Sequence, residues 1–313
     1  MHLMVPYAAA ASEAGMAAMH ALRLPQLQRL LCRLSAGART APSAASLNPP
    51  HEHVLAACRG WAGGDGRLPL AADLARADGL APVDDGRGWG LLTPTHWQVG
   101  SELVLLLDPG RLRLDEDESR ALLQSLRVLF EPEGWELHWG APLRWYAVHE
   151  SLRDLSTASL DRVIGQAIDQ WLPDRRAGRS VRRLQSEAQM LLHQHPTNAA
   201  REARGELPVN SFWLSGTGRT AAAPPDLSEP LVDARLRAPW LRQDWAAWVE
   251  AWQALDEQRL GELQARAARG EPVSLTLGGE RAAQRFDSVP QSAWRRLARR
   301  WRPLALEQVL QPL

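Results

Sequence analysis

The spacing of hydrophobic positions along the chain predicts a mixture of strands and helices. The apolar run HLMVPY is typical of a short strand, and the Ala- and Met-rich residues 8–21 are typical of a helix. Leucines at helical spacing over residues 24–34 predict an amphipathic helix that packs on a core. The Ser-, Gly- and Pro-rich residues 35–50 are predicted to form a linker, with another helix starting near Pro50.

The middle of the chain predicts a β-α-β-β arrangement. Two strands and a turn are expected in WGLLTPTHWQVGSELVLLLDP, followed by a helix with an acidic first turn over residues 115–130. Two further strands are expected to meet at Gly140-Ala141-Pro142. The Pro-rich stretch after Thr220 predicts a domain boundary. Helices are also expected over residues 70–77, 156–171 and 180–195.

The C-terminal third predicts Trp-rich helices, a strand VSLTL that ends at Gly278-Gly279, and a basic amphipathic helix, AWRRLARRWRPLALEQVL. Four tryptophans over residues 240–252 recur at helical spacing, which favours core packing. Trp and Arg are also enriched where protein interfaces bind most strongly. The basic helix is therefore either a solvated face or a docking surface for a protein partner or, less favoured, nucleic acid, through Trp294, Arg295, Arg299 and Trp301.

The composition excludes several classes of function but does not identify the function itself. No apolar run reaches the roughly 20 residues that span a bilayer, and the N-terminus lacks the basic flank of a signal peptide. We therefore predict a cytoplasmic protein without a membrane segment. The formal net charge is zero, which argues against nucleic-acid binding over the whole surface. All 36 residues in the Lys+Arg count are arginines, which excludes Schiff-base and Walker-type lysine chemistry.

Histidine and carboxylate patterns do not predict a metal site. The pairs His51/His53 and His193/His195 are spaced two residues apart, which places the two imidazoles on different faces of a helix. The acidic residues 115–118 suit a helix N-terminus. We predict no metal ligand and no cofactor.

The most informative stretch is HPTNAAREARGELPVNSFWLSGTGR, residues 195–219. It concentrates hydrogen-bond donors around a Gly-x-Gly turn, the combination that an anionic small ligand needs. A helix cap at His195 followed by a surface turn is the alternative. The predicted ligand-binding residues are Asn198, Arg201, Asn210, Ser215, Thr217 and Arg219, with His96 and Arg144 from neighbouring strands.

The same stretch resembles the HPxN..R...G..pAN...xGxG segment of the archaeal-type cofactor-independent phosphoglycerate mutases, which belong to the alkaline phosphatase superfamily. The preceding LLTPTHWQVGSELVLLLDPGRLRLDEDESRALLQSL is similar to the start of that family's inserted domain. The resemblance implies an α/β fold: a phosphatase-like α/β core, residues 1–85 and 225–313, with an inserted α+β domain, residues 86–224.

The resemblance also implies a two-metal site of Asp and His ligands beside a Ser or Thr nucleophile. This chain has Pro6 and Tyr7 where a metal-binding Asp would stand, and Gly278, Gly279 and Glu280 where Asp-His-Gly would stand. No DNxS-type nucleophile segment matches either. We therefore expect the catalytic residues of that family to be absent.

A broader resemblance, to bacterial RpfE-type regulatory proteins, is carried by MHLMVPYAAAASEAG, GRLPLAADLARADGLAP, LHWGAPLRWYA and PVNSFWLSGTG. It implies regulation rather than catalysis. We accordingly predict a non-catalytic regulatory protein, a degenerate mutase-like protein that binds an anionic small molecule or a protein partner. Two alternatives are a metal-dependent phosphoryl-transfer enzyme and an interaction or nucleic-acid-associated module that acts through the C-terminal Trp/Arg helix.

Overall fold

The computed structural model describes residues 1–81, 85–219, 229–288 and 306–313. Contacts divide the chain into two compact units. The terminal unit comprises residues 1–45, 49–60 and 224–313, and the central unit comprises residues 46–48 and 61–223. Both units combine helices with a sheet, so the predicted α/β class is confirmed.

The first boundary differs from the predicted one at residues 85/86. Residues 61–81 belong to the central unit, because helix α4 (Leu70–Ala77) buries its alanines against that unit's sheet. Ala71 and Ala75 pack against Trp89 and Tyr146 in one apolar cluster. The glycine-rich sequence after α4 is compatible with either boundary, so composition alone does not decide to which unit α4 belongs.

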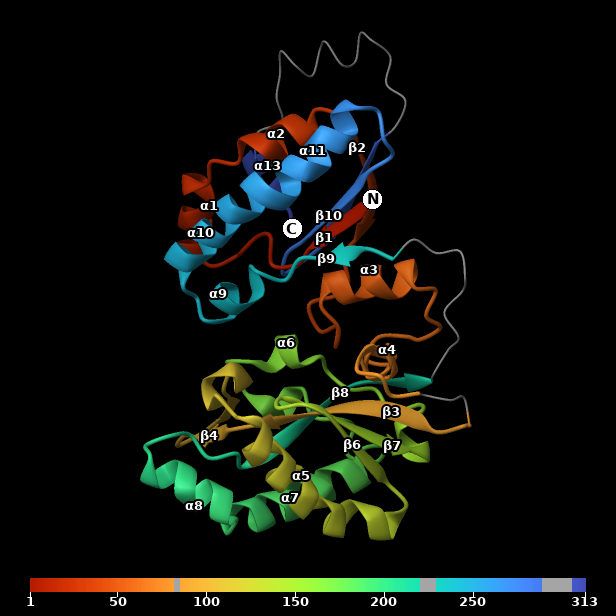
Figure 1. Ribbon diagram of the computed structural model, residues 1–313, viewed down its shortest axis with the longest axis vertical. Helices are drawn as coiled ribbons and strands as arrows, with labels where there is room; N and C mark the ends of the chain where they lie inside the picture. Colours follow the sequence, from red (N-terminus) through yellow and green to blue (C-terminus); the bar gives the residue numbers. More distant parts are fainter. Residues whose placement is uncertain (82–84, 220–228, 289–305) are drawn as a thin grey trace. The chain divides into compact units, whose positions relative to one another are not determined.

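The terminal unit is built on a five-stranded sheet in the order β2-β11-β10-β1-β9. Figure 1 labels β1, β2, β9 and β10 of this sheet. Strands β1, β9 and β10 are parallel, whereas β11 is antiparallel to both β10 and β2. The strands are β1 (His2–Val5), β2 (Leu34–Thr40), β9 (Leu231–Val232), β10 (Ser274–Gly278) and β11 (Ala283–Ser288).

One face of this sheet is apolar and carries the core of the unit. Leu3, Leu275 and Leu277 pack there with buried helix residues, among them Trp248 and Trp252. The core-packing prediction for these two tryptophans is confirmed, since both are fully buried. The helices of the unit are α1 (Glu13–Ala21), α2 (Pro25–Leu31), α3 (Pro50–Cys58), α9 (Arg237–Leu241), α10 (Trp245–Leu255), α11 (Gly261–Ala268) and α13 (Leu306–Leu310).

The opposite face of the terminal sheet is polar and lies against α3, which contacts β2, β10 and β11. His2 Nε2 lies 2.9 Å from Thr276 Oγ1, and the Ser274 hydroxyl donates to Asp287 over 2.5 Å. A buried parallel sheet is usually apolar on both faces. Because this face carries polar side chains that bond to one another, hydrogen bonds as well as packing stabilise it.

The central unit contains an antiparallel four-stranded sheet in the order β6-β7-β3-β8, plus a two-stranded hairpin, β4-β5. Helices α5 and α7 supply buried leucines to the core on one face, while α4 packs on the other. The strands are β3 (Gly88–Thr95), β4 (Trp97–Val99), β5 (Val104–Leu106), β6 (Glu136–Ala141), β7 (Arg144–His149) and β8 (Ser211–Arg219). The remaining helices are α5 (Glu116–Phe130), α6 (Leu160–Val163), α7 (Arg179–His193) and α8 (Pro196–Ala203).

Two predicted elements are wrong. Residues 35–40 form strand β2 rather than a linker; most of its side chains are exposed at a sheet edge, so no apolar alternation marks it. Residues 156–171 form only the short helix α6 and a 3₁₀ turn, Ile168–Gln170. Gly165 ends α6 in the left-handed region, with φ 75°, and donates its N–H to Leu106. Within the described ranges, no helix combines the length and apolarity needed to cross a membrane.

Candidate functional site

The carboxyl ends of parallel strands are where α/β sheets usually bind ligands. In the terminal unit, the segments that follow β1 and β10 meet there, because Ala8 N–H donates to the Gly278 carbonyl over 2.7 Å. Asp233 follows the third parallel strand, β9. We call this region the carboxyl edge.

Tyr7 is the most unusual residue of the carboxyl edge. Its φ is 61°, a left-handed conformation that costs energy for a bulky residue and is found most often at functional sites. The Trp248 indole holds this conformation by donating to the Tyr7 carbonyl over 3.0 Å. The Tyr7 ring packs against two other rings, with centroids 5.3 Å from His51 and 5.2 Å from Trp240.

His51 reaches the same place from the first turn of α3. A Cβ atom added at Gly278 would lie 3.2 Å from His51 Cβ, so a side chain there would crowd the helix. Glycine at the end of β10 therefore lets α3 approach the edge closely. No motif links Tyr7 to His51, since 44 positions separate them in the sequence and the fold brings them together.

The carboxylates of the carboxyl edge already have structural partners. Glu280 accepts the Ala11 N–H over 3.0 Å, and Asp233 pairs with the Arg235 guanidinium through two contacts of 2.9 Å. Within the described residues, no three His, Cys, Asp or Glu side chains are grouped so that they could hold a metal ion. The residues described at this edge do not fit a two-metal centre.

The predicted ligand-binding stretch lies in the central unit. Its first two predicted residues, Asn198 and Arg201, hold neighbouring backbone segments through hydrogen bonds. Asn198 is buried and donates its amide to the carbonyls of Leu192 and Val209, over 2.8 and 2.7 Å, and accepts the Val209 N–H. Arg201 is fully buried, pairs with Glu118, and donates to the carbonyls of Leu112 and Leu207.

Asn210 directly precedes β8 and His96 directly follows β3, and both side chains are also bonded internally. The Asn210 side chain accepts from Trp97 N–H over 2.7 Å and donates to Trp97 O over 2.9 Å. His96 Nδ1 lies 2.8 Å from the Pro208 carbonyl. These contacts tie the segment before β8 to the end of β3.

Thr217 and Arg219 lie at the far end of β8. The Thr217 hydroxyl donates to the Leu155 carbonyl over 2.6 Å and is fully buried, as Ser215 nearly is, whereas Arg219 is exposed. A strand rises about 3.3 Å per residue, so the ends of β8 lie roughly 25 Å apart. One small ligand cannot contact both ends, and the prediction of a single pocket is corrected; binding at either end stays a prediction.

Arg144 belongs to a third location, with Asp78 and Tyr146. Its guanidinium donates twice to Asp78, over 2.7 and 2.6 Å, and the Tyr146 hydroxyl donates to the same carboxylate over 2.6 Å. The hydrogen bond from Arg144 lowers the pKa of Asp78, and burial raises the pKa of Tyr146. The Arg144 guanidinium is therefore already paired with a carboxylate of the chain itself.

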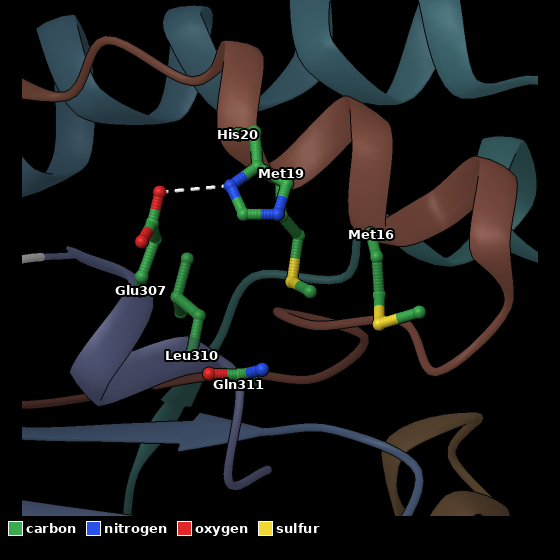
Figure 2. Close-up of a pocket in the computed structure, with 6 residues that line it drawn as sticks. All are labelled: Met16, Met19, His20, Glu307, Leu310 and Gln311. Carbon is green, nitrogen blue, oxygen red and sulfur yellow. Dashed lines mark hydrogen bonds and ion pairs between the residues drawn. The ribbon is translucent and has the colours of Figure 1, made fainter.

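Two further candidate sites are the C-terminal Trp/Arg residues and a pocket of the terminal unit. The predicted partner-binding residues Trp294, Arg295, Arg299 and Trp301 lie outside the described residues. Figure 2 shows a small pocket of the terminal unit in which methionines of α1 face α13, with a 2.8 Å ion pair between His20 Nδ1 and Glu307. Its lining residues are Met16, Met19, His20, Glu307, Leu310 and Gln311.

Comparison with known proteins shows a sequence similarity to an enzyme. The chain is 26% identical over 207 residues to a 2,3-bisphosphoglycerate-independent phosphoglycerate mutase of Methanosarcina mazei, a match over 64% of this chain and 49% of the mutase. The chain thus matches about half the length of that curated relative. No family model matches, so the resemblance to RpfE-type proteins stays a prediction.

Two solved structures also align with most of the chain. One is a cofactor-independent phosphoglycerate mutase of Thermoplasma acidophilum, at 13% identity and a TM-score of 0.38, covering 91% of this chain and 89% of that one. The other is a protein of Pyrococcus horikoshii, at 10% identity and a TM-score of 0.49, covering 92% and 87%.

The similarity to the M. mazei enzyme corrects the main prediction about function. A non-catalytic regulatory protein was expected because the catalytic pattern of the mutases was missing from the sequence. The relative found is an enzyme, which favours the alternative, phosphoryl transfer, over the non-catalytic interpretation.

Proposed function

We propose that this chain is an enzyme that acts on a small phosphorylated metabolite, in the class of phosphoryl-transfer reactions to which phosphoglycerate mutation belongs. The observation that carries the proposal is the 26% identity over 207 residues to a named phosphoglycerate mutase. The match leaves about half of that relative unaccounted for, so the substrate and the reaction are both part of the proposal.

The carboxyl edge is the place in the fold where we propose that this activity occurs. It lies where strands β1, β9 and β10 end, the part of an α/β sheet that most often binds substrates. His51 and Tyr7 lie there; Tyr7 is buried and His51 is partly exposed, and an imidazole N–H is of the kind that donates to phosphate or carboxylate oxygens. Histidine is also the side chain most often used to donate and accept protons near neutral pH.

A divalent metal pair would neutralise charge on the transferred phosphoryl group in enzymes of this class. The described residues do not supply ligands for such a pair at the carboxyl edge. We therefore assign no step to a metal and assign to this chain's own residues only binding and proton transfer.

The test is an assay of the full chain with 3-phosphoglycerate, in which 2-phosphoglycerate is followed by ³¹P NMR. Parallel reactions contain Mn²⁺ or EDTA, and thermal shift with 3-phosphoglycerate provides a readout that is independent of turnover. Conversion supports the proposal, and its survival in EDTA decides whether metal takes part. The proposal is overturned if there is no conversion, no hydrolysis of p-nitrophenyl phosphate and no ligand-dependent shift.

A further inference from the structure

The turn that follows β10 holds two backbone N–H groups that converge on one oxygen. The N–H groups of Arg281 and Ala282 donate to the backbone oxygen of Leu313 over 2.6 and 2.7 Å. Consecutive N–H groups of a strand point to opposite sides, so their convergence on one acceptor forms a nest, an arrangement that binds anions in many proteins. Both distances are short, since N–H···O bonds usually measure about 2.9–3.0 Å.

This nest belongs to the carboxyl edge. The turn begins directly after Gly278, the last residue of β10, and the Gly279 N–H closes it by donating to the Ala282 carbonyl over 2.9 Å. The Glu280 carboxylate accepts the Ala11 N–H and so ties the turn to the segment after β1. The nest therefore lies where the parallel strands end, the usual place for a ligand in an α/β sheet.

Gly279 leaves the space through which an acceptor reaches the nest. Its φ is not among the positive values of the chain, so its backbone conformation does not require glycine. A Cβ atom added there would lie 2.7 Å from the carbonyl carbon of Leu313 and 2.8 Å from its oxygen, which is too close for a real contact. Any side chain at position 279 would therefore fill the place of the bound oxygen.

Residues 311–313 reach the nest as a short tail of α13. The helix itself is anchored in the core of the terminal unit by three buried side chains, Leu306, Val309 and Leu310. In the tail, Leu313 is buried, whereas Gln311 and Pro312 are exposed. The tail can therefore leave the nest while α13 keeps its own contacts with the core.

The surroundings of the nest suit a phosphate group. Backbone N–H groups bind a charged oxygen more strongly than a neutral one. The Arg39 guanidinium donates to the Pro312 carbonyl over 2.7 Å, so a cation already reaches the tail beside the nest. Arginine pairs well with phosphate through its planar fork, and departure of the tail would release Arg39 for this purpose.

We propose that the N–H groups of Arg281 and Ala282 form a phosphate-binding site, which residues 311–313 occupy as an internal competitor. The inference rests on the function proposed above and deepens it, because it assigns a position to the phosphate group of the substrate. A site that is closed by the tail for part of the time binds its ligand with an apparent affinity reduced by the closed fraction.

Removal of the tail tests the site. A chain of residues 1–310 lacks the competitor and keeps the buried side chains of α13. It should bind inorganic phosphate about tenfold more tightly than the full chain, or better, because no fraction of it is closed. Isothermal titration calorimetry at constant ionic strength measures both affinities, and equal affinities overturn the proposal.

Two glycine variants of the shortened chain show where the phosphate binds. Gly279→Ala places a Cβ atom at the position of the bound oxygen and should abolish the gain in affinity. The control Gly261→Ala should keep the gain, because the added Cβ meets the Asp256 carbonyl at 3.6 Å, an ordinary contact. Tight phosphate binding that survives Gly279→Ala would lie elsewhere and would also overturn the proposal.

A measurement on the full chain decides the question if the shortened chain does not fold. A fluorophore on Gln311→Cys, with Cys32 and Cys58 replaced by serine, reports release of the tail as a fall in anisotropy. Inorganic phosphate should lower the anisotropy with saturation, and chloride at the same ionic strength should not. An anisotropy that phosphate does not change contradicts the competitor.

Turnover separates this site from the proposed activity. Tight phosphate binding by residues 1–310 without conversion of 3-phosphoglycerate by either chain would support the site and contradict phosphoryl transfer. Conversion by the full chain, with no gain of phosphate affinity on removal of the tail, would support the activity and overturn the site.

Discussion

His2 shows how a single buried side chain sets a pH dependence. Burial lowers the pKa of His2 to about 4, so the imidazole is neutral in the folded protein at pH 7. An unfolded chain has the ordinary histidine pKa of about 6.5. Between these two values the unfolded state binds more protons, so stability is lost as the pH falls through this window.

We expect the free energy of unfolding to fall by up to about 3 kcal/mol from His2 alone between pH 7 and pH 4. The variant His2→Asn does not titrate and should show a flatter profile. Urea unfolding across that range measures both proteins. Parallel profiles would show that His2 does not carry this dependence.

His51 provides the residue-scale test of the carboxyl edge. His51→Asn should lower turnover of the phosphorylated substrate by at least about 100-fold, the usual contribution of proton transfer by a side chain. The matched control is His53→Asn, on the same helix two residues further on, where the side chain points to another face. Equal effects of the two substitutions, or none from His51→Asn, would remove His51 from the site.

At the scale of elements, helix α2 depends on a side chain from far along the chain. Its own N-cap residue, Leu24, makes no side-chain cap, and the N–H groups of Gln26 and Leu27 are instead accepted by the Asp256 carboxylate over 3.0 and 2.8 Å. Asp256 is 2% exposed, so its loss would leave the buried Leu27 N–H and the part-buried Gln26 N–H without this acceptor.

Asp256→Ala should therefore lower the free energy of unfolding by about 1–3 kcal/mol. Asp256→Asn, which keeps one accepting oxygen, should recover part of this loss. The control Asp244→Ala removes the local, exposed cap of α10 and is expected to cost about 1 kcal/mol or less. Chemical denaturation gives all three values, and an Asp256→Ala loss no larger than that of Asp244→Ala would contradict the remote cap.

Elements with strong local signals could be read from the sequence. The predicted helix over residues 70–77 coincides with α4, and the acidic first turn correctly placed α5, whose cap is Asp115. Strand β2 could not be read, because its place is set by pairing with β11, more than 200 residues away. The candidate site has the same limit: the donors of residues 198–219 were visible, but their use in internal hydrogen bonds depends on partners such as Glu118 and Leu155.

At the scale of the whole molecule, the central unit takes three residues from before its main segment. Ser46 to Asn48 are held by Asp65, which accepts the Ser46 hydroxyl over 2.6 Å and the N–H groups of Leu47 and Asn48 over 2.8 and 3.1 Å. Asn48 in turn accepts the Gly66 N–H. Together with its own core of leucines and aromatic residues, this makes residues 46–48 and 61–223 one unit. The continuous stretch that spans it, residues 46–223, also carries α3, which packs on the sheet of the terminal unit.

A fragment of residues 46–223 should therefore unfold cooperatively on heating, and a fragment of residues 61–223 should unfold at a lower Tm because it lacks the segment that Asp65 binds. The substitution Asp65→Asn tests the hydrogen bonds between Asp65 and residues 46–48 separately from other effects of truncation. It should lower the Tm of the longer fragment by several degrees and change that of the shorter one little, because the partners are already missing there. An equal loss in both fragments would place the role of Asp65 within residues 61–223, and a non-cooperative melt of the longer fragment would show that the central unit needs the rest of the chain to fold.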